Sequence, residues 1–92
     1  MRYTVIWRDT ALQQLATIWM ASTDRAAVNR AVDDVDAELA DDPDQKGDDY
    51  YGDRYIINSV IWALYHVYPD DRTVHVLQAG RPGVDLPHDE VI

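Results

Sequence analysis

Apolar and polar residues alternate most regularly between positions 60 and 79, which read VIWALYHVYPDDRTVHVLQA. Two runs rich in Val, Ile, Tyr and Trp, residue types that favour strands, flank the turn-forming cluster Pro69-Asp70-Asp71. This pattern predicts a β-hairpin whose turn is centred on Asp70 and Asp71. The residue pairs that face each other in that register are His66 and His75, Leu64 and Leu77, and Trp62 and Ala79.

Successive side chains of a strand point to opposite faces, so the predicted hairpin has one apolar face and one mixed face. The apolar face is expected in the core and comprises Ile61, Ala63, Tyr65, Val67, Val74 and Val76. The mixed face is too apolar to be fully solvated, and we expect the C-terminal tail or a partner to cover it. Its members are Trp62, Leu64, His66, Tyr68, Thr73, His75 and Leu77, with Arg81 just beyond the strand.

Helical spacing of apolar residues predicts two helices joined by the short link Ser22-Thr23-Asp24. The first runs from a cap at Asp9 or Thr10 to about residue 21, and the second runs from a cap at Asp24 to about residue 40. Two amphipathic helices with so short a link predict an antiparallel helical hairpin. The first apolar stripe comprises Leu12, Leu15, Ala16 and Trp19, with Ala11 and Ile18 at its edge; the second comprises Val28, Ala31, Val32, Val35 and Leu39.

Further strands are predicted at residues 2–7 and 54–58, on either side of the helices. Between the second helix and the later strand, residues 41–53 lack a period and predict a surface loop. The order is β-α-α-β-β-β, which indicates an α+β fold with a helical hairpin packed on one face of a mainly antiparallel four-stranded sheet. The 92 residues fit a single domain, with residues 80–92 as an irregular C-terminal tail.

Composition narrows the classes of function. The absence of cysteine excludes a disulfide framework and a thiolate metal site. No apolar run approaches the ~20 residues that a membrane span needs, and the first ten residues do not resemble a secretory signal. We therefore expect a soluble cytoplasmic protein with no membrane contact and no cofactor.

The formal net charge of −9 belongs to residues 33–53, which hold ten of the seventeen acids and one of the eight bases. A surface of this sign steers phosphate groups poorly, so we expect weak or no direct binding of free nucleic acid. The ten acids are Asp33, Asp34, Asp36, Glu38, Asp41, Asp42, Asp44, Asp48, Asp49 and Asp53.

Part of this acidic segment matches a calcium-binding loop. Asp42, Asp44, Gly47 and Asp53 fall at the template positions, but Lys46 stands where an oxygen ligand is needed. A solvated loop is therefore favoured, and no metal site is predicted.

Candidates for chemistry lie on or near the mixed face of the hairpin. Opposed residues such as His66 and His75 have Cβ atoms about 5 Å apart, close enough to share a proton or a phosphate. An ordinary cross-strand pair is the alternative. Trp62 offers a flat stacking surface, and the Arg81 guanidinium is suited to a phosphate or carboxylate.

The element order and several short stretches together resemble the RelE/ParE family of toxins from type II toxin–antitoxin systems. The resemblance covers about residues 3–81. The stretches that carry it are residues 3–7 with Ala11, Leu12 and Leu15, then Leu39 with Pro43, and residues 52–54, 63–67 and 70–77.

The resemblance implies a compact toxin that an antitoxin protein wraps and neutralises. Some family members cleave messenger RNA in the ribosome, and others poison DNA gyrase. In the ribonuclease branch a base often stands where this chain has Trp62, whereas Arg81 and Arg54 match bases in or after other strands. Some ribonuclease members use histidines. The implied catalytic candidates are Arg81, His66, His75 and Arg54.

We expect a toxin-like protein that acts by binding a macromolecular target, with DNA gyrase and the ribosome as the candidates. The residues expected to contact a partner are Trp62, Leu64, Leu77, Tyr68 and Arg81. A ribosome-dependent endoribonuclease is the first alternative and requires a basic or histidine cluster on the mixed face. A non-toxic relative that serves as an interaction module is the second, and requires only an apolar groove. The sequence leaves open whether the protein is an enzyme.

Overall fold

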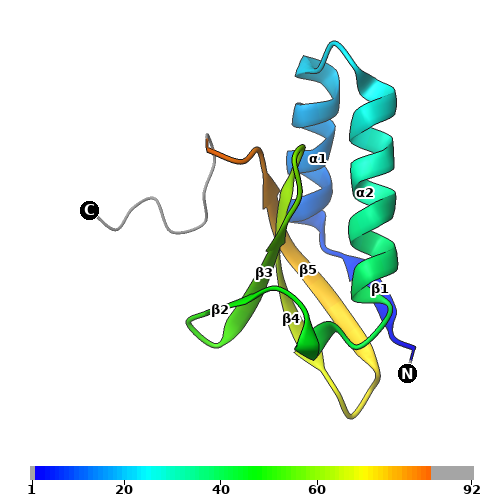
Figure 1. Ribbon diagram of the computed structural model, residues 1–92, viewed down its shortest axis with the longest axis vertical. Coiled ribbons are helices and arrows are strands. Elements are labelled where there is room, and N and C mark those ends of the chain that lie inside the picture. Colours follow the sequence, from blue (N-terminus) through cyan, green and yellow to red (C-terminus); the bar gives the residue numbers. More distant parts are fainter. Residues whose placement is uncertain (1, 84–92) are drawn as a thin grey trace.

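The computed structural model describes residues 2–83, which form a five-stranded sheet with two helices over one face (Figure 1). The predicted fold class is confirmed, with one strand more than predicted. Residues 84–92 of the predicted tail lie outside the described residues, and Gly80 belongs to the last strand rather than to a tail. The elements are β1 (Thr4–Trp7), α1 (Asp9–Ala21), α2 (Arg25–Leu39), β2 (Asp48–Tyr50), β3 (Asp53–Ile57), β4 (Trp62–Tyr68) and β5 (Thr73–Gly80), in the sheet order β1-β5-β4-β3-β2.

The first and last strands are neighbours in the sheet. β1 pairs with β5 in parallel, with Thr4 opposite Thr73, whereas the other pairs of adjacent strands are antiparallel. The odd-numbered residues of β1, Val5 and Trp7, are half-buried and pack against the core. The parallel pair places the residue after β1, Arg8, beside the middle of β5, where the Arg8 N–H donates to Val76 O at 2.9 Å.

The β4–β5 hairpin follows the predicted register near its turn and departs from it further on. His66 faces His75 as predicted. An irregularity between Leu64 and Tyr65 then shifts the pairing, so that Leu64 faces Gln78 instead of Leu77. It also places Trp62 opposite Gly80 instead of Ala79. These two predicted pairs are wrong because a β-bulge inserts one residue into a strand, which alternation alone does not reveal.

The α1 helix stabilises β5 beyond this bulge. The side-chain Oε1 of Gln14 accepts a hydrogen bond from the Ala79 N–H at 2.7 Å. The side chain thus binds a backbone N–H of β5 beyond Val76, where the pairing of β5 with β1 ends.

The core lies between the helices and the sheet. Ile61, Ala63, Tyr65, Val74 and Val76 are all 0 % exposed, which confirms the predicted apolar face of the hairpin. The predicted stripe of α2 is confirmed as well, because Val28, Ala31, Val35 and Leu39 are buried and Val32 packs beside them.

The predicted stripe of α1 is only partly right because the helix is rotated: Leu15 packs against the core as predicted, but other members do not. Ala11 and Ile18 are buried, whereas Leu12 is 49 % exposed and Trp19 is 39 % exposed. Because Ala11 has a small side chain, the helix can approach the sheet closely on that side, which turns the larger residues outward. The helix begins at Asp9 after Arg8, and no side-chain cap is recorded at this end in the described chain, so the predicted cap is also wrong. The cap of α2 is confirmed, since Asp24 accepts from Ala27 N at 3.1 Å.

The segment between α2 and β3 is more ordered than the predicted surface loop. It contains a 3-10 turn (Pro43–Gln45) and the short edge strand β2. The hydroxyl of the buried Tyr65 lies 2.9 Å from Pro43 O and 2.8 Å from Lys46 O and donates to both. Burial raises the pKa of the Tyr65 hydroxyl above its ordinary value of 10.0, and the nearby Arg54 opposes that rise.

Gly47 is required where this segment meets β3. Its φ angle is +66°, and a Cβ atom there would lie 2.3 Å from Tyr55 O. Only glycine avoids both the left-handed strain and the collision. The Lys46 ammonium joins this segment to the end of α2 by donating to Asp41 O at 2.7 Å and to Glu38 O at 3.2 Å.

Candidate functional site

The candidate residues on the sheet face opposite the helices separate into two groups along the β4–β5 hairpin. His66, Tyr68 and His75 lie near the turn, whereas Trp62 and Leu64 lie near the other end. Six extended residues separate His75 from Arg81, a distance of about 20 Å along the strand. The structure therefore does not bring the histidine pair and Arg81 into one site.

His66 is held by a carboxylate from the neighbouring strand. Its Nδ1 lies 2.7 Å from Asp53 Oδ1, and the two side chains are 40 % and 30 % exposed respectively. An ionised carboxylate only accepts hydrogen bonds, so Nδ1 carries the proton. In the neutral ring this leaves the Nε2 lone pair available to a ligand.

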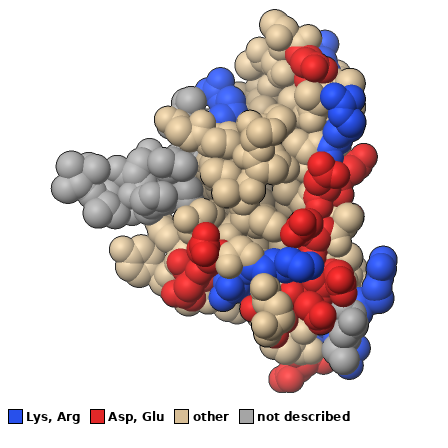
Figure 2. Space-filling view, in the orientation of Figure 1, with Lys and Arg blue, Asp and Glu red and all other residues tan. Residues whose placement is uncertain are grey.

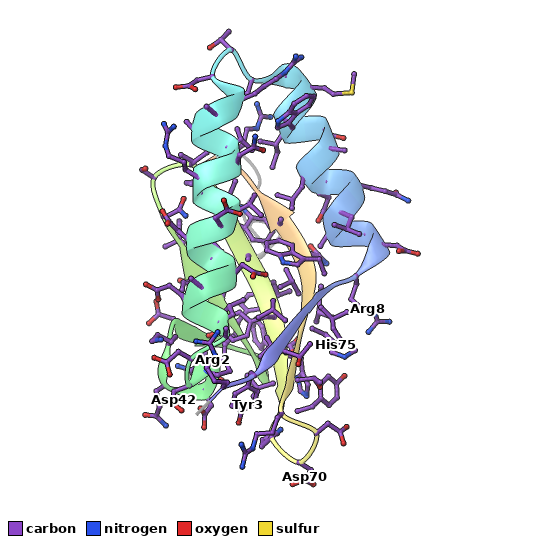
Figure 3. The ribbon with its side chains drawn as sticks, turned by 90° about the vertical axis from the view of Figure 1, so that its right-hand side faces the viewer. Arg2, Tyr3, Arg8, Asp42, Asp70 and His75 are labelled. Carbon is purple, nitrogen blue, oxygen red and sulfur yellow. The ribbon has the colours of Figure 1, made fainter. Side chains whose placement is uncertain are left out.

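His75 is held from the opposite side by the residue that follows β1. The Arg8 guanidinium lies 3.1 Å from His75 Nδ1, and Figure 3 shows both side chains on the same side of the molecule. A guanidinium only donates, so Nδ1 accepts and the proton of His75 is on Nε2. The Tyr68 ring packs edge-on against both imidazoles, with centroids 4.7 Å from His66 and 4.8 Å from His75.

These contacts give the turn end of the sheet a row of polar groups that we call the polar row: Asp53, His66, Tyr68, His75 and Arg8. Chemically, a carboxylate-held imidazole can act as a general base, and a guanidinium can stabilise a nearby anion. Sequence reasoning identified the histidines but missed the roles of Asp53 and Arg8. Their positions depend on the pairing of β3 with β4 and of β1 with β5, which the sequence did not supply.

The apolar residues at the other end of the hairpin have little exposed surface. Trp62 is 3 % exposed and Leu64 is 6 % exposed, while Leu77 is half-buried. The indole of Trp62 is therefore not open to solvent as the predicted stacking surface requires, while the partner contacts expected of Trp62, Leu64 and Leu77 stay a prediction. The Trp62 indole N–H is buried and has no hydrogen-bond partner among the residues that the structure describes.

The two arginine candidates lie in different places. Arg54 donates to Lys46 O at 2.7 Å and to Gly47 O at 2.9 Å, so its guanidinium closes the loop before β2. It pairs with Tyr65 in the sheet and so points to the face opposite His66. Arg81 is exposed just past the end of β5. The bases that a single cluster would require are therefore dispersed.

The acidic side chains are unevenly distributed over the surface. Figure 2 shows acidic side chains gathered over the second half of α2 and the segment that follows it. Within residues 2–83, no group of three or more His, Asp or Glu side chains is placed to hold a metal ion. In the same part of the chain, no helix has the length and apolar character to cross a membrane.

An apolar groove that the sequence did not predict runs between α1 and α2. Its volume is about 760 Å³. It was missed because Leu12 and Trp19, which the apolar pattern assigns to the core, are exposed instead. The residues that line it are Leu12, Leu15, Ala16, Trp19, Met20, Val28, Asn29, Val32 and Asp33.

No protein-family model matches the sequence, and no curated protein matches it. Solved structures do match. The RelBE2 toxin–antitoxin complex from Mycobacterium tuberculosis has a chain with a TM-score of 0.73 at 20 % identity, over 88 % of this chain and 92 % of that one. The chromosomal ParDE system from P. aeruginosa gives 0.61 at 16 % identity, over 87 % and 96 %.

A mutant of the E. coli toxin RelE in the free state gives a TM-score of 0.63 at 19 % identity, over 92 % of this chain and 88 % of that one. The protein is thus a two-layer α+β domain. More particularly, its fold is that of the RelE/ParE toxins, as the resemblance in sequence predicted.

Proposed function

We propose that this protein is the toxin-like component of a type II toxin–antitoxin system, which binds a macromolecular target in the cytoplasm and is neutralised by an antitoxin protein. The observation that carries the proposal is the fold shared with RelE and ParE over nearly the whole chain. Two of the similar structures are complexes of toxin with antitoxin, which supports an antitoxin as the partner.

The distribution of bases favours binding over cleavage. Cleavage of a phosphodiester requires positive charge around the scissile group. Here Arg54 is committed to the carbonyls of Lys46 and Gly47, and Arg81 lies about 20 Å from the histidines. DNA gyrase and the ribosome are the targets to test first.

The test is inducible expression of the full chain in a bacterial host, with and without the product of the neighbouring small reading frame. We expect growth arrest that co-expression relieves, and co-purification of the two products. The matched control replaces the buried Ile61 by Asp, which prevents folding and should abolish both effects. Complex formation without arrest would favour the non-toxic interaction module, and absence of both would overturn the proposal.

Two purified assays then separate the targets. Inhibition of DNA supercoiling by gyrase supports the first, and inhibition of translation in a reconstituted reaction supports the second. Activity in neither assay, from protein that arrests growth, would exclude both targets.

A ribosome-dependent endoribonuclease is the second candidate, and the hydrogen bond between Asp53 and His66 favours it. In such a reaction His66 Nε2 would take the proton of a ribose 2′-hydroxyl. That oxygen would attack the adjacent phosphorus to form a 2′,3′-cyclic phosphate, and the 5′-oxygen would leave as a hydroxyl after taking a proton from water, while the Arg8 guanidinium beside His75 would stabilise the phosphate. The polar row supplies the base and one cation, but not the wider cluster of bases.

Translation of a defined messenger RNA in vitro, followed by mapping of 5′ ends, decides between the candidates. We expect no cuts in the ribosomal A site. Cuts that disappear in Arg81→Ala or in His66→Asn would overturn the binding proposal in favour of the nuclease.

A further inference from the structure

Tyr51 is the most exposed large apolar residue in the part of the chain that the structure describes. It is 82 % exposed, whereas the next, Met20, is 70 % exposed. Tyr51 belongs to the turn between β2 and β3, and Figure 1 shows that turn at the outer edge of the sheet, away from both helices. A single exposed ring is ordinary on a protein surface, so its meaning depends on the backbone and the charges around it.

The backbone of this turn disfavours a tyrosine. Tyr50 pairs with Asp53, and the two residues between them, Tyr51 and Gly52, have φ angles of +51° and +91°. Positive φ at both central positions is the mark of a type I′ turn, for which Asn-Gly is a preferred sequence. A bulky L residue is strained in this left-handed conformation. Because an asparagine would close the same hairpin with less strain, the fold alone does not account for the ring of Tyr51.

Neighbouring side chains hold the Tyr51 ring at the acidic face of the hairpin. Its centroid lies 4.8 Å from that of Tyr50 in an edge-on contact, and Tyr50 packs edge-on against Tyr55 with centroids 6.4 Å apart. Asp48 precedes Tyr50 by two residues in β2 and pairs with Tyr55, so these side chains share the sheet face opposite the helices. The exposed carboxylate of Asp48 therefore lies on the face with which the Tyr51 ring is in contact.

The charge around the ring is negative. Asp48 and Asp49 are exposed in β2, and Asp53 follows the turn. Arg54, the nearest base to Tyr51 in the sequence, points to the opposite face and donates to backbone carbonyls. A cation is therefore the complement of this surface. An aromatic ring with a carboxylate beside it suits a planar guanidinium, which stacks on the ring and donates to the carboxylate.

We propose that the β2–β3 turn binds an arginine side chain of a protein partner, with the guanidinium stacked on the Tyr51 ring and paired with the Asp48 carboxylate. Because Tyr51 is 82 % exposed, the contact with Tyr50 leaves most of its surface available. The turn projects from the sheet, so the arginine belongs to a recess of the partner. The inference does not depend on the proposed function, because it concerns the side chain that is bound and not the protein that carries it.

Other occupants fit less well. Nucleic acid would bring phosphates beside the carboxylates of Asp48 and Asp49. A second copy of this chain carries a net charge of −9, and residues 84–92 contain three acids and no base, so both have the same sign as the turn. A purely apolar partner would leave the carboxylates without a counter-charge.

The test uses two blocked hexapeptides on the intact protein, followed by NMR at the amide signals of Tyr50 and Tyr51. One peptide carries two arginines among glycine and serine, and the other carries citrulline, which has nearly the same shape and no charge, at the same positions. The arginine peptide should shift both signals and bind at least about threefold more tightly than the citrulline peptide. Equal affinity for the two peptides would overturn the inference.

Replacing the ring separates binding from folding. Tyr51→Asn should weaken binding of the arginine peptide by about twofold to fivefold, and Tyr51→Phe should retain it, because the stacking surface is the ring. Asparagine is favoured in this turn, so Tyr51→Asn should leave the unfolding temperature unchanged or raise it. Wild-type affinity in Tyr51→Asn would contradict the proposal, and a lowered unfolding temperature would show that the ring serves the fold instead.

The matched control for the charge is a pair of adjacent residues. Asp48→Asn should weaken binding of the arginine peptide by about twofold, whereas Asp49→Asn makes the same change on the opposite face of β2 and should leave the affinity within error of wild type. The NMR spectrum of each variant shows whether it is folded. An equal loss in both variants would mean that only the overall charge attracts the peptide, and would overturn the assignment to Tyr51 and Asp48.

Discussion

The segment from residue 41 to residue 53 and the α1–α2 pair use their side chains in opposite ways. The segment is rich in Asp and poor in apolar residues, yet Tyr65, Arg54 and Lys46 bind its backbone carbonyls. The helices are rich in apolar residues, yet they leave a wide groove open to solvent. Hydrogen bonds to backbone groups can therefore order an acidic segment, while apolar content alone does not close a helix pair.

The largest effect is expected from replacing Gly47, which tests how the segment from residue 41 to residue 53 is ordered. Gly47→Ala should lower the free energy of unfolding by about 4 kcal/mol, because it combines a left-handed φ with a collision against Tyr55 O. Gly52→Ala is the control: its φ is also positive, but a Cβ there meets nothing within 4 Å, so we expect a loss of about 1–2 kcal/mol. Urea unfolding of both variants measures the difference. Equal losses would show that the segment does not depend on the close approach at Gly47.

The helix side of the contrast is tested by a pair of truncations in α1. Ile18→Ala should cost about 2–4 kcal/mol because it opens a cavity in the core. Leu12→Ala should cost less than about 1 kcal/mol because half of that side chain is already in water. Thermal unfolding would contradict the observed rotation of α1 if Leu12→Ala proved the more damaging change.

Removing the Tyr65 hydroxyl tests the hydrogen bonds that join the core to the segment from residue 41 to residue 53. Tyr65→Phe removes the hydroxyl donor that Pro43 O and Lys46 O share, while Lys46 N–H and Arg54 still donate to these carbonyls, so it should cost about 1 kcal/mol at neutral pH. Because burial raises the pKa of Tyr65, its favourable effect is complete below pH 10 and is lost as pH rises through the folded-state pKa. The stability gap between wild type and Tyr65→Phe should therefore narrow above pH 10. A gap that widened with pH in denaturant titrations would contradict the assignment.

The smallest expected effect concerns the start of α2. Asp24→Ala removes the acceptor of the Ala27 N–H and should cost about 1 kcal/mol. Thr23→Ala, one residue earlier and exposed, should stay within about 0.5 kcal/mol of wild type. If both variants unfold at the same temperature, the cap contributes nothing measurable.

These regions also show how much of the fold could be predicted from the sequence. The core face of the hairpin was predictable because Ile61, Ala63 and Tyr65 fall on one side of a strand by its period of two, but the same alternation did not predict that Trp62 and Leu64 are buried on the other side. The rotation of α1 was not, because Ala11 and Leu12 both count as apolar and only packing against the sheet distinguishes them. The strand β2 was missed because Asp48-Asp49-Tyr50 has a weak strand preference and is ordered by pairing with β3.

The candidate site was predictable only in part. The pairing of His66 with His75 follows from the turn, and it is observed. The contacts of His66 with Asp53 and of His75 with Arg8 required the order of all four neighbouring strands. The hydrogen bonds of Arg54 to the carbonyls of Lys46 and Gly47 were not predictable either, since backbone carbonyls have no signature in the sequence.

The parallel pairing of β1 with β5 affects folding during synthesis on the ribosome. Thr4 and its partner Thr73 are sixty-nine residues apart, so the ribosome needs several seconds between them at about 5–20 residues per second. During that interval β5 does not yet exist. β1 therefore has no strand to pair with, and one edge of β4 also lacks its neighbour. A chain released before β5 is synthesised therefore has no complete sheet, and premature termination yields no finished polar row.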